Sequence, residues 1–186
     1  MKNVLLFILL ITGITGMNAQ DKYFTKDASV SFDATVNASL ETIAAKSTTG
    51  SSVIEVSTGK IEFAVLARSL KFEKLMMEQH FNENYIESNK YPKAAFKGKI
   101  DNIKDINFQK NGTYKANVSG DLTMHGVTKA IKTTATITVN NGQVNATSQF
   151  SVALKDYKIK IPAMVGEKVS KNAKIMVEAH YQKLDK

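Results

Sequence analysis

The sequence predicts an all-β fold: an eight-stranded antiparallel β-barrel with one amphipathic helix near residues 70–86. Three observations support this prediction. Apolar and polar residues alternate with period two in segment after segment. Short turns containing glycine separate these segments, and one stretch breaks the alternation with helix-forming residues. A sheet of about eight long strands exposes two edges unless it closes, so we expect a barrel.

The alternating segments run through most of the chain and give the predicted strands in order. They lie at residues 30–36, from 53–56 onward, and at 61–67, 96–100, 114–122, 131–139, 144–154 and 175–181. In each segment one face is apolar and the other polar, as in strands whose inner face is buried. The longest such face starts at Val144 and ends at Leu154.

Four short connectors separate these segments and predict turns. They are Thr58-Gly59, Asn111-Gly112, His125-Gly126 and Asn141-Gly142. Asn-Gly between alternating segments is a strong hairpin signal, because both residues tolerate positive φ. Strands joined by short turns are antiparallel neighbours, so the second half is predicted to be an up-and-down meander.

Residues 70–86 contain neither glycine nor proline and predict an amphipathic helix of about three to four turns. Apolar residues at helical spacing are Phe72, Leu75 and Met76, and Met77, Phe81 and Tyr85. We expect the helix to end before Tyr91-Pro92, because the residue before a proline favours extended geometry.

A closed barrel of this size either fills its interior with side chains or holds one small ligand. Many predicted inward positions carry small residues: Ala34, Ala67, Gly98, Ala116, Gly120, Ala135, Ala146, Ser148 and Ala179. Such residues favour a cavity. The alternative is that they compensate for bulky neighbours in a filled core.

The N-terminus has the pattern of an export signal. Lys2 precedes an apolar run at residues 4–14, and Ala19 suits cleavage. The run is shorter than the roughly 20 apolar residues of a spanning helix, which argues against the alternative of a retained anchor. We therefore expect a signal peptide at residues 1–19 and one domain at 20–186. The periplasm is the expected location, with secretion or the cell surface as alternatives.

Charge and composition restrict the expected partners. The formal net charge is +8, the chain has no cysteine, and Arg68 is its only arginine. Nucleic-acid readers favour arginine, so nucleic acid is not an expected partner. Residues 155–174 mix lysines with apolar side chains, which suggests transient contact with an anionic membrane surface. The alternative is a solvated strand face and loop.

No motif for catalysis or for metal binding stands out. His80, His125 and His180 have no second histidine at ligand spacing. We therefore predict no enzyme activity, no metal and no cofactor. A hydrolase that uses His80 or His125 ranks last among the alternatives.

Aromatic residues and methionines on the helix and the strands suggest an apolar pocket. The candidate ligand-binding residues are Phe63, Met76, Met77, Phe81, Tyr85, Phe96, Met124, Phe150 and Met164. Thioethers adapt to irregular apolar shapes, and aromatic side chains commonly line ligand sites. The alternative is that these residues form ordinary core.

Three elements occur in a characteristic order: an early strand at residues 29–34, Tyr91-Pro92 followed by Phe96, and the stretch GDLTMHGVTK at residues 120–129. With these elements the chain resembles the YceI-like family of exported bacterial lipid-binding proteins. The resemblance implies a lipocalin-like barrel around a long apolar channel. It also implies binding of polyisoprenoid chains, such as those of isoprenoid quinones, without catalysis. Residues 75–81 depart from the usual family pattern.

Overall fold

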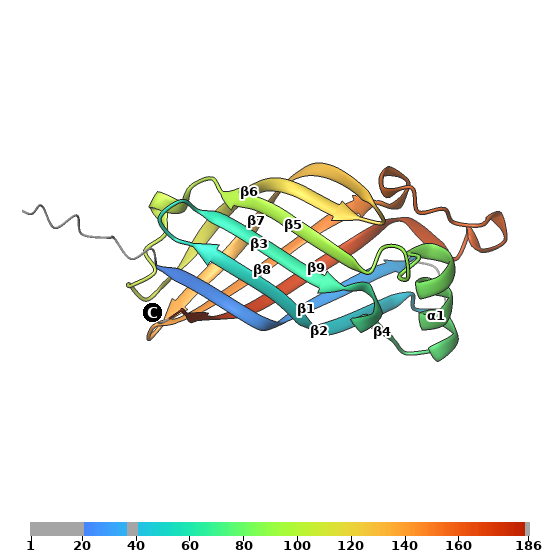
Figure 1. Ribbon diagram of the computed structural model, residues 1–186, viewed down its shortest axis with the longest axis horizontal. Coiled ribbons are helices and arrows are strands. Elements are labelled where there is room, and N and C mark those ends of the chain that lie inside the picture. The colour runs from blue at the N-terminus through green and yellow to red at the C-terminus, as the bar shows by residue number, and fades with distance from the viewer. Residues whose placement is uncertain (1–20, 37–40, 185–186) are drawn as a thin grey trace, which may run out of the picture.

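The computed structural model describes residues 21–36 and 41–184. The predicted signal peptide at residues 1–19 lies outside the described residues. Eight strands close into an antiparallel barrel in the order β1-β9-β8-β7-β6-β5-β3-β2, and pairing of β1 with β2 completes the ring (Figure 1). The strands are β1 (Lys22–Thr35), β2 (Ala44–Glu55), β3 (Lys60–Leu66), β5 (Lys93–Ile100), β6 (Gly112–Met124), β7 (Val127–Asn140), β8 (Gln143–Ala153) and β9 (Val169–Lys183). The predicted fold class is confirmed.

Two of the predicted turns join neighbouring strands as tight hairpins. His125 and Gly126 have φ values of 50° and 71°, and Asn141 and Gly142 have 49° and 81°. Two successive positive φ values match the right-handed twist of the flanking strands. The strands β6, β7 and β8 therefore follow one another directly, and the predicted meander is confirmed.

The prediction of a turn at Asn111-Gly112 was wrong. Gly112 is already the first residue of β6, and β5 reaches it through residues 101–111, which contain the short helix η3 (Ile103–Asp105). Asn111 supports the neighbouring hairpin instead, because its Oδ1 accepts a hydrogen bond from the backbone N–H of Asn141 at 2.8 Å.

The strand β2 begins earlier than the sequence pattern indicated. Residues 53–56 were predicted to open a strand, but β2 starts at Ala44 and ends at Glu55. Its first buried positions are Ala45, Ser47 and Gly50, which are small or polar and give little hydrophobic alternation. Pairing with β1 along most of its length holds this half of β2 in the barrel.

The predicted helix at 70–86 is shorter than expected and runs from Leu75 to Tyr85. It consists of α1 (Leu75–His80) and one wider turn, η2 (Phe81–Tyr85), which ends with a hydrogen bond from the N–H of Ile86 to the carbonyl of Phe81 at 2.9 Å. The preceding residues form η1 (Ala67–Ser69) and the two-residue strand β4 (Lys71–Phe72). Because β4 pairs with β2, residues 71–72 are held extended and the helix starts later.

Helix α1 lies at one end of the barrel, together with the loop between β8 and β9, and β9 ends at the opposite end (Figure 1). The loop contains η4 (Leu154–Tyr157) and η5 (Ala163–Val165). The buried core falls into two clusters, and Tyr23 stacks on Phe108 at a centroid distance of 5.3 Å in the one away from the helix. Among residues 21–36 and 41–184, no helix has the length and apolarity needed to cross a membrane.

Candidate ligand-binding cavity

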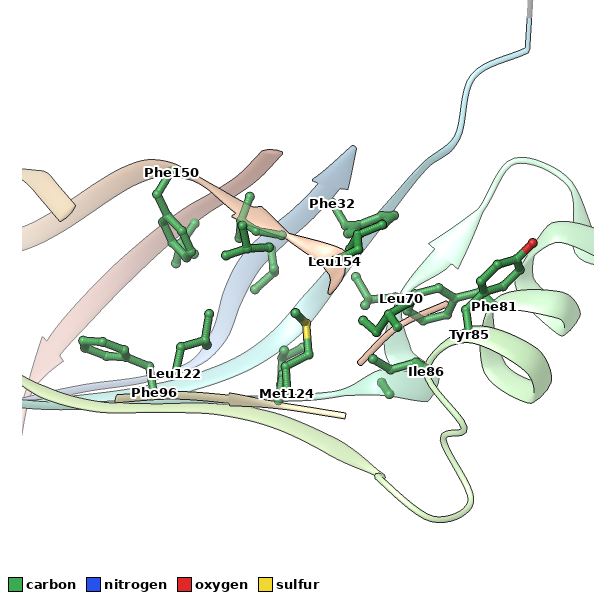
Figure 2. A pocket seen from close by; sticks show the side chains of 18 of the residues that line it. Phe32, Leu70, Phe81, Tyr85, Ile86, Phe96, Leu122, Met124, Phe150 and Leu154 are labelled. Atoms are coloured by element: carbon green, nitrogen blue, oxygen red, sulfur yellow. The ribbon is translucent and has the colours of Figure 1, made fainter. Parts of the chain in front are cut away.

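The barrel encloses a cavity of about 440 Å³. This volume lies within the range of about 300–1,000 Å³ that is typical of small-molecule sites. Side chains from opposite walls point toward one another across it, with Phe96, Leu122 and Met124 facing Phe150 and Leu154 (Figure 2). The inner faces of the strands therefore do not fill the barrel.

Aromatic rings occupy part of the barrel interior, and glycines make room for them. The Phe63 and Phe96 backbones are register partners on β3 and β5. A Cβ added at Gly50 would lie 2.8 Å from the Phe63 ring, and one added at Gly120 would lie 2.8 Å from the Phe96 ring. At these positions the small residues compensate for bulky neighbours, as the filled-core alternative expected, while alanines elsewhere leave space.

The helical segment supplies the wall at one end of the cavity. Met77, Phe81 and Tyr85 are four residues apart and line the cavity together. The Phe81 ring lies 5.8 Å from that of Phe32 and 5.1 Å from that of Phe72, between centroids. These contacts tie the helix to β1 and β4 and place it over the open end of the barrel (Figure 2).

Charged side chains occur at the rim of this open end. Glu41, Lys74, His80 and Lys168 border the cavity, and Lys74 Nζ lies 2.7 Å from Glu41 Oε1. The hydrogen bond from Lys74 holds the pKa of Glu41 below its ordinary value, and the same contact raises the pKa of Lys74. The rim therefore carries two ammonium groups and one carboxylate, and it suits the polar end of an amphipathic molecule.

Away from the helix, the cavity lining includes a buried and uncharged polar side chain, that of Tyr181. Ser52 Oγ donates a hydrogen bond to the carbonyl of Glu62 at 2.8 Å, so its oxygen accepts from the Tyr181 hydroxyl at 2.7 Å. Burial raises the pKa of Tyr181 to about 12. The phenol therefore stays neutral at neutral pH, and an apolar chain meets no charge there.

The structure brings eight of the nine predicted site residues to this cavity. Phe63, Met76, Met77, Phe81, Tyr85, Phe96, Met124 and Phe150 line it. Met76 lies at the rim and is 69% exposed, whereas Met164 is 93% exposed and lies outside the lining. Contact of these residues with a ligand stays a prediction.

The structure adds lining residues that the sequence analysis did not select as site residues. Phe32, Leu122, Ile131 and Ile175 are examples. Each lies on the inner face of a strand, so the alternation that predicted the strands also contained the signal for them. The candidate residues predicted from the sequence were aromatic residues and methionines, so most aliphatic positions were left out.

The three histidines lie in separate places, with His80 in α1 at the cavity rim, His125 in the β6–β7 turn and His180 on β9. His125 lies outside the cavity lining, with Nδ1 2.8 Å from the carbonyl oxygen of Tyr157 and Nε2 2.9 Å from Glu87 Oε2. His180 Nδ1 lies 2.7 Å from Asn145 Oδ1 on the exposed surface. In the part of the chain that the structure describes, no group of three or more histidine and acidic side chains is placed to hold a metal ion.

Comparison with known proteins agrees with this architecture. The structure is similar to a polyisoprenoid binding domain from Saccharophagus degradans, with a TM-score of 0.76 and 14% identity over 89% of this chain and 100% of that one. It is also similar to BcnA from Burkholderia cenocepacia, with a TM-score of 0.66 and 15% identity over 83% of this chain and 96% of that one. At these identities the likeness establishes the fold alone.

A search of curated proteins found no match. The sequence matches the YceI-like domain over residues 20–181, which is most of its length. The chain therefore belongs to the YceI-like domain family.

Proposed function

We propose that this chain is an exported carrier protein that holds a long apolar molecule, a polyisoprenoid or an isoprenoid quinone, in its barrel. The observation that supports this proposal is the cavity, whose wall is almost entirely apolar and whose charges lie at the rim. Transfer of each buried CH2 group from water contributes about 0.8 kcal/mol, so a long hydrocarbon chain binds tightly with few polar contacts.

The ligand class follows from the shape of the site and from the family. An elongated interior with a polar rim suits an extended chain with a polar head better than a compact polar substrate. The similar domain from Saccharophagus degradans is described as polyisoprenoid binding. We transfer that ligand class to this chain as part of the proposal.

Export and membrane contact belong to the same proposal. The segment at residues 1–19 has the pattern of a cleavable signal peptide, which supports a carrier in the periplasm or beyond it. Exposed apolar side chains of Leu75, Met76 and Met164 occur on the helix and the β8–β9 loop, at the end of the barrel that carries Lys74 and Lys168. Apolar residues beside lysines suit transient contact with an anionic membrane surface.

We assign the chain no catalytic role. His125 is held by the Tyr157 carbonyl and Glu87, and it lies outside the cavity lining. The structure therefore offers no support for a hydrolase that uses this residue. The other alternative is a filled barrel that acts as a structural or interaction module without ligand, and the cavity of about 440 Å³ argues against its filled interior.

A direct test is uptake of a defined apolar molecule by the purified protein, stripped of bound lipid. We expect a polyprenol and an isoprenoid quinone to bind and to raise the melting temperature, because both bind the folded state alone. A short polar alcohol serves as the control and should leave the melting temperature unchanged. Absence of binding by both isoprenoids would contradict the proposal.

A further inference from the structure

The wall of the barrel is not continuous between β7 and β8. Their pairing runs from Asn140 opposite Gln143 to Ala135 opposite Ser148. Beyond that point β7 pairs with β6 and β8 pairs with β9, but among the described residues no ladder joins residues 127–134 of β7 to residues 149–153 of β8. We call this interval the split.

Both ends of the split are fastened. At its inner end Ser148 Oγ donates a hydrogen bond to the carbonyl of Thr134 at 2.8 Å. At its outer end His125, in the β6–β7 turn, donates from Nδ1 to the carbonyl of Tyr157 in η4, because a carbonyl oxygen only accepts. The split is therefore a slot of defined length rather than a frayed sheet edge.

The wall at the split is thin. A second, smaller hollow of about 180 Å³ lies there, lined by residues of β7, β8 and η4. Ile131 and Val152 line both this hollow and the central cavity. These two short aliphatic side chains are therefore shared by the two spaces and separate them.

Passage through the split costs less than parting two strands along a hydrogen-bonded ladder. Parting a paired seam breaks several ladder hydrogen bonds, each with a net contribution of about 0.5–1.5 kcal/mol. Parting the split breaks no such ladder. It requires movement of Ile131 and Val152, and of Tyr157, which also lines the hollow and is buried. The alternative route past the helix displaces Phe81 from its contacts with Phe32 and Phe72.

We propose that the split is a lateral portal through which an apolar chain slides between the cavity and its surroundings. The proposal rests on the proposed carrier function and adds a route of exchange to it. A long chain leaves sideways along its length in this mechanism, while its polar end stays near the charged rim.

The chain has no cysteine, so the portal can be locked by a designed crosslink. Continuing the β7–β8 register places Ala130 opposite Ala153, and both line the outer hollow and not the cavity. The double variant Ala130→Cys/Ala153→Cys, joined by a short bismaleimide and checked by mass, closes the split. The control is Gln149→Cys/Met176→Cys, which joins register partners on the paired strands β8 and β9.

The probe is a dansyl-labelled farnesol supplied from phosphatidylcholine vesicles. We expect the Ala130–Ala153 crosslink to slow its uptake and release about tenfold, equivalent to about 1.4 kcal/mol in the barrier. The amount bound at equilibrium should not change, and the control crosslink should leave the rates as they are in the unlinked protein.

Unchanged rates in the crosslinked protein, or equal slowing by the control crosslink, would overturn the portal while leaving the carrier function intact. If the unlinked protein is a dimer that the crosslink dissociates, and the rates are unchanged, the portal is also overturned. The split would then be a site where a strand of a second copy pairs with the sheet. Failure of every form to take up the probe would overturn the carrier function and the portal together.

A second pair of variants tests the portal without crosslinking. Ile131→Ala shortens one of the two side chains that separate the cavity from the hollow. Ile175→Ala removes the same atoms from a cavity-lining isoleucine on the paired strand β9. We expect faster release of the probe from the Ile131 variant than from the Ile175 variant. Equal release rates would contradict the portal.

Discussion

Single small residues set how much space the barrel contains. Ala135 and Ala146 line the cavity from β7 and β8, whereas Gly50 and Gly120 lie beneath the Phe63 and Phe96 rings. An alanine on the inner face leaves open space when no ring covers it. A small residue on the inner face is therefore not enough to predict a cavity. The outcome depends on whether a bulky side chain from a neighbouring strand covers it.

The substitution Ala135→Phe should block the cavity. The added ring occupies space in the lining, with a stability cost of about 1–3 kcal/mol from overpacking. We expect the variant to fold and to lose most polyprenol uptake, measured by titration with the labelled chain. Thr136→Phe places the same ring on the exposed face of the same strand, and uptake equal to that of this control would contradict the account.

Tyr181 gives a prediction about high pH. Burial raises its pKa in the folded protein to about 12 from the ordinary value of 10.0, so folding favours the neutral phenol. The stabilising effect is complete below pH 10 and is lost as pH rises toward 12. We expect the free energy of unfolding to fall less over this interval in Tyr181→Phe than in the parent protein, measured by urea unfolding at each pH. If the free energy of unfolding falls equally with pH in the two proteins, burial of this phenol does not control the loss of stability.

At the scale of elements, the helical segment gives a test of how the open end is closed. Phe81→Ala removes the ring contacts with Phe32 and Phe72. We expect faster release of bound chain and a stability loss below the roughly 3–5 kcal/mol of a fully buried phenylalanine, because Phe81 is only half-buried. Leu75→Ala, on the same segment but 80% exposed, is the control for stopped-flow release measurements. Equal release from both variants would contradict a covering role for Phe81.

The sequence predicted elements well where burial was one-sided. Strands such as β7 and β8 present one apolar face to the interior, so period two is visible in their residues. The first half of β2 and the two-residue β4 were missed because their positions depend on pairing with distant strands rather than on their own alternation. The split between β7 and β8 has no counterpart in either strand's pattern, since both alternate through it.

At the scale of the whole molecule, the exposed side chains of Leu75, Met76 and Met164 share one end of the barrel with Lys74 and Lys168. We expect the protein to sediment with vesicles that contain anionic lipid and to sediment little with neutral vesicles. Its binding to anionic vesicles should weaken as the salt concentration rises. The double variant Leu75→Ser/Met164→Ser should weaken binding, while Val53→Ser, 43% exposed on β2, should not. Equal binding to anionic and neutral vesicles would contradict the proposed contact.

The sequence also located most of the candidate site, because the inner face of the barrel and one face of the helix are regular patterns. Met164 was misplaced for a local reason: it lies in η5 within an irregular loop, where neither period two nor helical spacing indicates direction. The depth and polarity of the cavity could not be predicted from the sequence. They depend on contacts such as that between Ser52 and Tyr181, which are 129 residues apart in the chain.

Native mass spectrometry of the protein purified from its own host tests the central claim most directly, because it weighs the barrel together with whatever it carries. We expect a complex whose added mass is that of one isoprenoid chain or isoprenoid quinone, released on unfolding. A barrel that emerges empty, and that stays empty after incubation with host lipid extract, would contradict the claim that this chain carries an apolar ligand.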